Sequence, residues 1–293
     1  MAQRRVAIVT GGTRGIGQGI SSALAAQGLD LLLGYGTNTE AAECHAKELR
    51  AGGANVALVA GDVAEEATLS RYFEVLAAEF PGQTLGALVH NAGQYVGVTA
   101  ENSAGIEAGK PLGFGSLLGE DGQVNLSHMD YYHRIYARAF VQLVERAVPL
   151  FKEGGAVVGI SSPGCNCTQT PAEAYDMPGS AKAVVEVAAR YYAKNLAPKG
   201  ITVNVVIPGI TESDAWKNLG KGKGKGQGNE MCHSVAERAC PMGRAQSARE
   251  LGEVVAFLCG PHGRYITGVA LPVDGGLHLG RKAPAGPPPG KGA

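Results

Sequence analysis

The chain has 293 residues, enough for one large α/β domain or two smaller ones, so its length does not decide the number of domains. Lysine plus arginine equals aspartate plus glutamate at 26 each, which excludes a strong overall field that would attract nucleic acid or an anionic membrane. A hydrophobic fraction of 45% and 44 glycines favour a sheet covered on both faces, with many tight turns. We expect a small molecule as partner, with neither nucleic acid nor membrane.

Seven short runs of β-branched or aliphatic residues recur along the chain, each followed by a stretch of helical period. They are Val6 to Thr10, Leu29 to Leu33, Val56 to Ala60, Ala87 to His90, Val157 to Ile160, Ile201 to Ile207 and Val269 to Val273. Strands that alternate with helices predict a parallel, doubly wound sheet with helices on both faces, a Rossmann-type α/β fold. The carboxyl ends of such strands share one edge, where ligands bind. We expect a single domain over residues 1–280.

Three regions interrupt this alternation. Residues 95–127, rich in glycine, replace the helix expected after the fourth strand, and we interpret them as an elaborated loop that covers the substrate. Residues 211–243 are the expected substrate loop region. They contain the run Lys221-Gly-Lys-Gly-Lys-Gly, which is either a solvated loop or a contact for the phosphates of an acyl thioester. Residues 281–293, with three consecutive prolines, are expected to be a disordered tail.

The cysteines and the apolar runs point to a compartment. No cysteine belongs to a Cys-x-x-Cys pair or shows zinc-type spacing; the six stand at positions 44, 165, 167, 232, 240 and 259. We therefore expect free thiols and no bound metal. No apolar run approaches the roughly 18 to 20 residues needed to cross a bilayer, and the first one begins at Val6, which leaves no room for a targeting sequence. These features favour the cytoplasm.

A glycine-rich loop follows the first predicted strand and opens directly into a helical pattern. It reads Thr10-Gly11-Gly12-Thr13-Arg14-Gly15-Ile16-Gly17. Glycines let the backbone turn sharply and approach a pyrophosphate, whose charge lies at the helix N-terminus. The alternative is a tight structural turn. The position between an N-terminal strand and a helix predicts a dinucleotide site that includes Gly11, Thr13, Arg14, Gly15, Ile16 and Gly17.

The end of the second predicted strand indicates which dinucleotide binds. An acidic residue there would hydrogen-bond the ribose 2′-hydroxyl and repel a 2′-phosphate. The chain instead has Gly34-Tyr35-Gly36-Thr37-Asn38, with no acid. Arg14 can make a bidentate phosphate contact, and Thr37 and Asn38 can donate hydrogen bonds. We therefore predict NADP(H) as cofactor, with a plain surface charge as the alternative for Arg14.

The spacing Thr-Gly-x-x-x-Gly-x-Gly resembles the signature of the short-chain dehydrogenase/reductase superfamily. Further motifs of that family follow in order: Asp62-Val63, His90-Asn91-Ala92-Gly93, Ile160-Ser161-Ser162, Pro208-Gly209 and Val273-Asp274-Gly275-Gly276. The resemblance covers residues 4 to about 279. It implies that Asp62 and Val63 contact adenine, and that the cofactor site also includes Asn91, Ala92, Gly93, Lys182, Pro208 and Gly209. It further implies a homo-oligomer, a tetramer or a dimer.

In the common branch of the family a Ser, a Tyr and a Lys four residues after the Tyr carry the chemistry. The Lys holds the nicotinamide ribose and lowers the pKa of the Tyr, which passes the proton. Lys182 aligns with that Lys, but Pro178 stands four residues before it. Tyr175 lies seven residues before Lys182, a Tyr-x6-Lys pattern that resembles the enoyl-acyl carrier protein reductase branch. Ser162 precedes Tyr175 by 13 residues, the family's usual separation. Ser162, Tyr175 and Lys182 are the predicted catalytic residues.

The proline predicts how Tyr175 is presented. Pro178 can occupy the first turn of a helix and pushes Met177 toward an extended conformation, so Tyr175 is expected on the entering strand rather than on the helix. Tyr136 stands where the common branch keeps an Asn in its proton relay. Enoyl reduction tolerates this loss better than carbonyl reduction does, because the Tyr then mainly stabilises a developing enolate oxygen.

Four functions remain open on these residues. The first is an NADP(H)-dependent reductase of an enoyl thioester, the second a carbonyl or 3-oxoacyl reductase, and the third a non-catalytic NADP(H)-binding protein. The fourth is a biosynthetic enzyme that has drifted to isomerase or cyclase chemistry and keeps the cofactor pocket. Each residue also has a structural alternative: Ser162 as a turn cap, Tyr175 as a packed aromatic and Lys182 as a surface charge. Cys165 and Cys167 are interpreted as packed thiols, with a redox-sensitive pair as the alternative.

Overall fold

The computed structural model describes residues 4–94, 113–152, 154–172, 175–213, 216 and 227–280. Seven parallel strands form one sheet in the order β3-β2-β1-β4-β5-β6-β7. They are β1 (Val6–Thr10), β2 (Asp30–Tyr35), β3 (Val56–Ala60), β4 (Leu85–His90), β5 (Gly155–Ile160), β6 (Ile201–Pro208) and β7 (Ala270–Val273). The predicted Rossmann-type sheet is confirmed, with strand ends that move by one or two residues.

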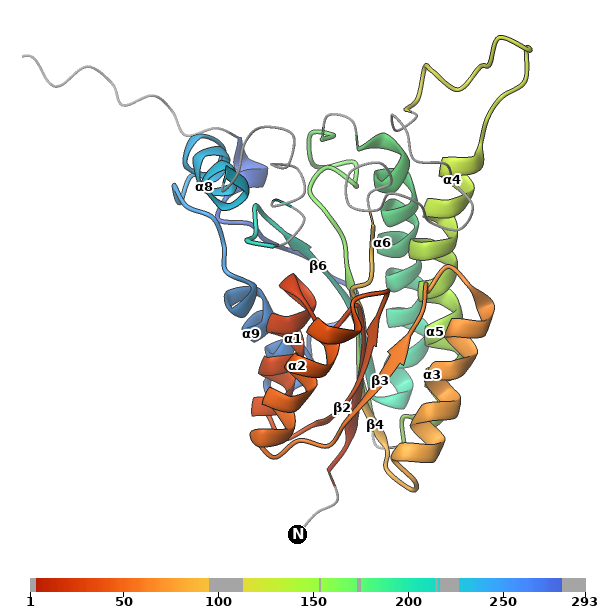
Figure 1. Cartoon of the computed structure of the whole chain (residues 1–293), viewed down its shortest axis with the longest axis vertical. Coiled ribbons are helices and arrows are strands. Elements are labelled where there is room, and N and C mark those ends of the chain that lie inside the picture. Colours follow the sequence, from red (N-terminus) through yellow and green to blue (C-terminus); the bar gives the residue numbers. More distant parts are fainter. Residues whose placement is uncertain are drawn as a thin grey trace, which may run out of the picture.

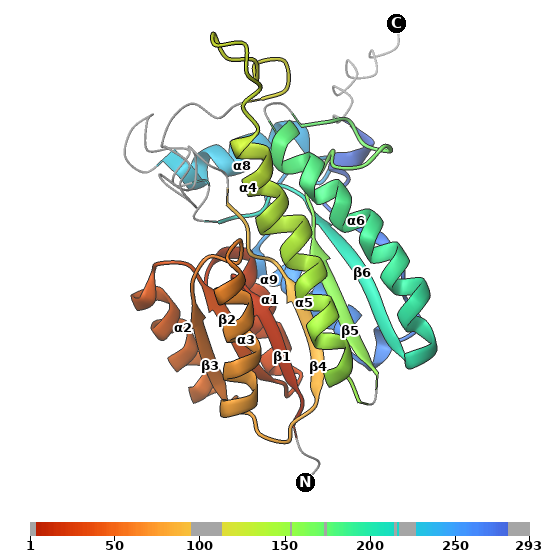
Figure 2. The same cartoon turned by 90° about the vertical axis from the view of Figure 1, so that its right-hand side faces the viewer.

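Helices cover both faces of the sheet (Figures 1 and 2). One layer holds α1 (Gly15–Ala26), α2 (Thr39–Ala51) and α9 (Ala248–Cys259); the other holds α3 (Glu66–Glu79), α4 (Ser127–Tyr132), α5 (Ala139–Ala147) and α6 (Asp176–Leu196). A π-helical turn (His133–Arg138) joins α4 to α5, and α8 (Gln227–Ala239) lies beyond the carboxyl ends of the strands. None of the helices in the described ranges is long and apolar enough to cross a membrane.

The first strand shows why an uninterrupted apolar run folds as a central strand. Successive side chains of a strand point to opposite faces. Val6 and Ile8 belong to the core under α3, α5 and α6, whereas Ala7 and Val9 belong to the core under α1 and α9. All four are buried. The run therefore has no polar face because this sheet has no solvent face.

Close packing of α1 against α9 depends on glycine. A Cβ atom added at Gly19 would lie 2.0 Å from the carbonyl oxygen of Ala248, and one added at Gly252 would lie 2.2 Å from the carbonyl oxygen of Gly19. The two helices thus meet backbone to backbone. This contact fixes α1, whose N-terminus is the predicted phosphate site, against α9, the last α-helix that the structure describes.

The strand order places a topological switch point beside β1. After β1 the chain moves outward to β2 and β3, then returns to β4 on the other side of β1. In doubly wound sheets, ligands bind in the crevice outside the carboxyl ends at such a point. The glycine-rich loop after β1 and the Asn91 motif after β4 lie there.

Three predicted regions have different outcomes in the structure. Residues 95–112 of the expected loop lie outside the described residues, while the described part from 113 to 126 folds back on itself, with an antiparallel bridge between Leu118 and Val124, and projects beyond the sheet (Figure 1). Part of the expected substrate loop region forms α8. The Gly/Lys run and residues 281–293 lie outside the described residues.

Candidate active site

The glycine-rich loop has the geometry of an anion site. Gly11 and Gly15 have φ values of +61° and +51°, a backbone conformation that favours glycine. A Cβ at Gly17 would lie 1.8 Å from the carbonyl oxygen of Gly11, so the loop closes tightly over the start of α1. The first turn of α1 contains no acid, and the side chain of its N-cap residue, Arg14, makes no capping hydrogen bond. The backbone N–H groups at the start of α1 are therefore suited to bind a phosphate.

Asn91 holds this loop from the neighbouring strand. Its side-chain amide donates to the carbonyl oxygens of Thr10 and Gly11, at 3.2 and 2.9 Å. On the other side, the Gly12 N–H donates to the carbonyl oxygen of Gly34, at 2.9 Å, which joins the loop to the end of β2. These contacts bring the predicted phosphate-binding loop next to the predicted 2′-phosphate-binding segment.

The remaining predicted cofactor residues lie along the same edge. Asn38 is the N-cap of α2, where its side-chain oxygen accepts from the Ala41 N–H at 2.9 Å, and Thr37 is exposed beside it. Asp62 follows β3 and accepts a hydrogen bond from the Tyr131 hydroxyl at 3.0 Å. Val63, Ala92, Gly93, Pro208 and Gly209 also follow or end strands at this edge. The residues present fit a dinucleotide, because a glycine loop, a helix N-terminus and donor side chains meet here.

Ser162, Tyr175 and Lys182 come together at the carboxyl end of β5 and the start of α6. The hydroxyl oxygens of Ser162 and Tyr175 are 3.1 Å apart, within hydrogen-bond distance. Lys182 is buried, and its Nζ donates to the carbonyl oxygens of Ile160 and Ser161, both at 3.2 Å. The Tyr-x6-Lys spacing therefore places the Tyr hydroxyl beside the Ser hydroxyl.

The expected conformation of Met177 is wrong. Helix α6 begins at Asp176, so Met177 is helical rather than extended, and Tyr175 is the N-cap residue. Pro178 does lie in the first turn, as predicted. The preference of a residue before proline for extended backbone is overcome here because the side chain of Met177 is buried in the core under α6.

The ring of Tyr136 faces the ammonium group of Lys182. Its ring centroid is 4.8 Å from the Lys182 Nζ, and its hydroxyl donates to the carbonyl oxygen of Gln94 at 2.8 Å. The side chain belongs to the π-helical turn and is buried. Burial raises the pKa of Tyr136 well above its ordinary value, and the neighbouring Tyr175 adds to the rise. Tyr136 is therefore a neutral phenol in this position.

His90 is a site residue that the sequence motif contained but did not single out. The hydroxyl of Thr10 accepts from the N–H groups of Asn91 and Ala92, both at 3.0 Å, so its own proton is left for Nδ1 of His90 at 3.1 Å. The other nitrogen, Nε2, then carries a proton and donates to the carbonyl oxygen of Ile135 at 3.1 Å. Burial, together with the charge of Lys182, lowers the pKa of His90 to about 4.

Glu186 was missed by the sequence reasoning. It lies one helical turn after Lys182, is buried, and accepts hydrogen bonds from the Ser161 hydroxyl at 2.5 Å and the Asn166 amide at 3.1 Å. The i, i+4 spacing from Lys182 was the available signal.

Cys165 and Cys167 lie on the loop between β5 and α6. Cys165 is buried, which raises the pKa of its thiol, whereas Cys167 is exposed, and both are free thiols. The packed interpretation therefore fits Cys165.

A pocket of about 270 Å³ adjoins the loop that carries Ser162. One wall is formed by this loop and the other by the segment after β7; the lining residues are Pro163, Gly164, Gln169, Thr170, Ala172, Leu277, His278 and Gly280. The imidazole Nδ1 of His278 is 2.9 Å from both carboxylate oxygens of the buried Asp274, which fixes the ring at the pocket wall. The pocket thus offers apolar walls and a few polar groups, as small-molecule sites do.

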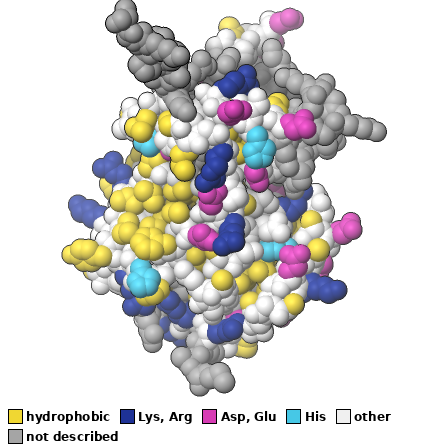
Figure 3. Space-filling model, turned by 90° about the vertical axis from the view of Figure 1, so that its left-hand side faces the viewer, with side chains coloured by type: hydrophobic (Ala, Val, Ile, Leu, Met, Phe, Trp, Pro, Cys, Tyr) yellow, Lys and Arg dark blue, Asp and Glu magenta, His cyan; other side chains and the backbone are white. Residues whose placement is uncertain are grey.

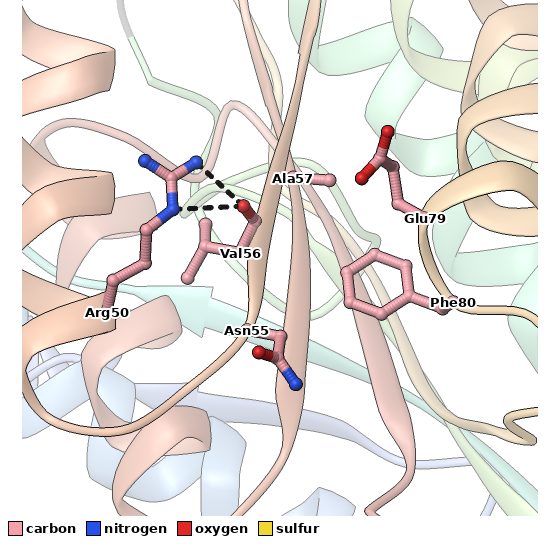
Figure 4. Close-up of a pocket in the computed structure, with 6 residues that line it drawn as sticks. All are labelled: Arg50, Asn55, Val56, Ala57, Glu79 and Phe80. Atoms are coloured by element: carbon pink, nitrogen blue, oxygen red, sulfur yellow. Dashed lines mark hydrogen bonds between the residues drawn. The ribbon is translucent and has the colours of Figure 1, made fainter.

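A second pocket, of about 220 Å³, lies far from these residues in the fold. It is at the amino end of β3, lined by Arg50, Asn55, Val56, Ala57, Glu79 and Phe80 (Figure 4). Arg50 closes one side by donating twice to the carbonyl oxygen of Val56, at 3.2 and 2.7 Å. Because Val56 begins β3, this pocket is at the sheet edge opposite the carboxyl ends. It therefore has no access to the Ser162, Tyr175 and Lys182 group.

Comparisons with known proteins agree with this geometry. A family model described as enoyl-(acyl carrier protein) reductase matches residues 11–278. The 1-cyclohexenylcarbonyl-CoA reductase of Streptomyces collinus is 30% identical, with 94% of this chain and 88% of that protein covered. The 3-oxoacyl-[acyl-carrier-protein] reductase of Escherichia coli is also 30% identical, with 94% and 98% covered.

A solved structure gives the same result at the level of the fold. The L-sorbose reductase of Gluconobacter frateurii, in complex with NADPH and L-sorbose, superposes with a TM-score of 0.76 at 26% identity, covering 94% of this chain and 97% of that chain. The chain thus belongs to the short-chain dehydrogenase/reductase family and is an oxidoreductase of that family, which binds a nicotinamide dinucleotide.

Proposed function

We propose that this protein is an NADPH-dependent reductase of an activated carbon–carbon double bond, with an enoyl thioester as substrate. The observation that carries the proposal is the closed environment of Lys182. Tyr175 and Ser162 share a hydrogen bond at the site, whereas the far side of Lys182 is covered by the ring of Tyr136. This arrangement suits a reaction in which Tyr175 donates a hydrogen bond without having to be recharged through Lys182.

The preference for NADPH is supported by charge. Arg14 is an exposed cation at the N-terminus of α1, and the segment after β2 presents Thr37 and Asn38 with no acid. The 2′-phosphate of NADPH would be held by these three side chains, while the α1 N-terminus holds the pyrophosphate. The bound cofactor supplies the hydride. The NADPH complex of the structural relative is consistent with this preference.

The side chains at the centre then have distinct tasks. Tyr175 and Ser162 donate hydrogen bonds to the thioester oxygen and stabilise the negative charge that develops on it. Lys182 would hold the nicotinamide ribose and supply a positive charge at the site. The β-carbon of the substrate gains a hydride and its α-carbon gains a proton from solvent, so the double bond becomes a single bond. The pocket beside Pro163 is placed to receive the acyl group, and its volume favours a compact chain or ring.

A carbonyl or 3-oxoacyl reductase is the second candidate. The 3.1 Å pair of Ser162 and Tyr175 supports it, because the same two hydroxyls can polarise a ketone oxygen and pass a proton to it. A relative with 30% identity carries that activity in its name. The two candidates differ in proton demand, since only the ketone takes a proton from Tyr175 in each turnover.

The deciding experiment compares crotonyl-CoA with acetoacetyl-CoA, following the absorbance of NADPH. Wild-type protein should reduce the enoyl substrate faster. Tyr175→Phe should lower kcat by about 100- to 10,000-fold while the Kd for NADPH stays within about twofold, because the phenol touches substrate rather than the nucleotide. Tyr191→Phe, an exposed tyrosine of α6, is the matched control and should behave as wild type.

Each other outcome has a definite meaning. Faster reduction of acetoacetyl-CoA would replace the enoyl proposal by the carbonyl one. Tight NADPH binding without turnover of either thioester would contradict both and favour a non-catalytic NADP(H)-binding protein.

A further inference from the structure

The buried ammonium group of Lys182 has three partners among the residues that the structure describes. Its Nζ donates to two carbonyl oxygens, those of Ile160 and Ser161, and faces the ring of Tyr136 at 4.8 Å from the centroid. An ammonium carries three N–H groups, and burying one is costly unless its charge is compensated. A ring face within about 6 Å attracts a cation, and the attraction is stronger when both groups are desolvated. The ring is thus a substantial part of what holds this charge in place.

The ring itself is fixed from several sides. Its hydroxyl is held by the Gln94 carbonyl, and its face lies parallel to that of Tyr132, with centroids 6.2 Å and planes 6° apart. The π-helical turn that carries Tyr136 is in turn held by His90, which donates to the carbonyl oxygen of Ile135. Space for the ring depends on Gly93, where a Cβ would lie 2.8 Å from the ring carbon Cε1 and 2.8 Å from the hydroxyl oxygen of Tyr136. The aromatic ring is therefore a rigid surface.

We propose that Tyr136 is a positioning residue for Lys182, and that it acts on cofactor affinity through that lysine. Its ring clamps the ammonium against the two carbonyl oxygens at the end of β5, the place from which the side chain reaches the nicotinamide ribose. The proposal rests on the contact of Lys182 with the cofactor in the proposed function. It does not depend on which substrate is reduced.

A double-mutant cycle on unfolding tests the clamp without any cofactor or substrate. Urea unfolding is measured for wild type, Tyr136→Leu, Lys182→Met and the double variant. Tyr136→Leu removes packing in both backgrounds but removes the attraction to the ammonium only when Lys182 is present. We expect it to raise the unfolding equilibrium constant about tenfold more in the Lys182 background. Equal effects in the two backgrounds would overturn the proposal.

NADPH fluorescence titration tests the effect on the cofactor. Tyr136→Leu should weaken NADPH binding about tenfold, whereas Tyr136→Phe should stay within about twofold because it keeps the ring. Phe80→Leu is the matched control: it removes a buried ring from the same core at the sheet edge opposite the carboxyl ends of the strands. The same loss in Phe80→Leu and Tyr136→Leu would reduce Tyr136 to a packing role.

A third readout covers the case in which Tyr136→Leu does not fold. Phenylalanines with one, two and three ring fluorines at position 136 keep the shape but progressively weaken the negative face of the ring. NADPH affinity should fall with each fluorine, and a flat series would contradict the clamp. Because all three readouts are free of turnover, failure of the clamp is distinguishable from failure of the reductase proposal, which is judged on the two thioesters.

Discussion

At the scale of single residues, the proposed preference for NADPH over NADH depends on exposed side chains. Arg14, Thr37 and Asn38 lie on adjacent loops because the Gly12 N–H joins the glycine loop to the end of β2. The backbone groups beside them are proposed to bind the part of the cofactor that NADH and NADPH share. Changing one of the three should therefore alter selectivity without altering the dinucleotide site itself.

Arg14→Ala tests this separation. We expect the Kd for NADPH to rise about 10- to 100-fold, since a charge-assisted phosphate contact contributes roughly 1.5–3 kcal/mol, while the Kd for NADH changes less than about twofold. Both are measured by fluorescence titration. Arg249→Ala is the control, because Arg249 is an exposed arginine of α9 paired with Glu253. Equal loss for NADPH and NADH would show that Arg14 does not contact the 2′-phosphate.

At the scale of elements, one imidazole connects three parts of the fold. His90 ends β4, its Nδ1 meets Thr10 at the end of β1, and its Nε2 meets the π-helical turn. A proton added at Nδ1 would remove the acceptor that Thr10 needs. Burial, together with the nearby ammonium of Lys182, lowers the pKa of His90 to about 4 from the ordinary 6.5.

This depressed pKa predicts how stability changes with pH. Between about pH 6.5 and pH 4 the unfolded chain binds a proton at His90 that the folded chain does not bind. The contribution of His90 to the free energy of unfolding is therefore fully present above about pH 6.5 and is lost as pH falls toward 4. At 1.36 kcal/mol per unit, the shift corresponds to about 3 kcal/mol.

Urea unfolding at pH 7, 5.5 and 4 checks this expectation. Protonation of carboxylates with lowered pKa values, such as Glu250, also destabilises the folded protein in acid. The measurement therefore compares wild type with His90→Asn, which cannot titrate. The stability difference between the two proteins should shrink on acidification. Parallel curves would mean that His90 titrates alike in the folded and unfolded chains.

At the scale of the whole molecule, exposed apolar side chains gather on the side of α8 and α9 (Figure 3). Exposed residues of α9 and of the segment that leads to β7 include Phe257, Tyr265 and Val269. Isolated exposed apolar residues are common, but a gathered set indicates an association surface. This surface is consistent with the homo-oligomer that the family resemblance implies.

The oligomer proposal is checked by light scattering coupled to size-exclusion chromatography. Wild-type protein should elute as an assembly larger than one chain, and Phe257→Glu combined with Tyr265→Glu should shift it toward a smaller species, because a charge on each apolar contact is costly to bury. Tyr191→Glu, on α6, is the comparison variant. A wild-type monomer would contradict the proposal.

The sequence by itself determined the sheet and the cofactor edge. Apolar runs of strand length, each followed by helical period, are sufficient for a doubly wound sheet, and the glycine loop is a local device whose backbone shape depends on its own residues. The meeting of Ser162 and Tyr175 was also predictable, because both lie on one loop between β5 and α6. The backbone conformation of Met177 was not predictable, because burial of its side chain overcame the preference for extended backbone before a proline.

Only the tertiary structure decided which long-range groups surround Lys182. Tyr136 and His90 come from parts of the chain far from Lys182, and no spacing rule relates an aromatic residue of one helix to a lysine of another 46 positions later. Their arrangement follows from crossing connections that bring α5 and α6 onto the same face of the sheet. The local sequence determines which side chains each segment supplies, whereas burial and long-range packing determine which of them contact the charged group of Lys182.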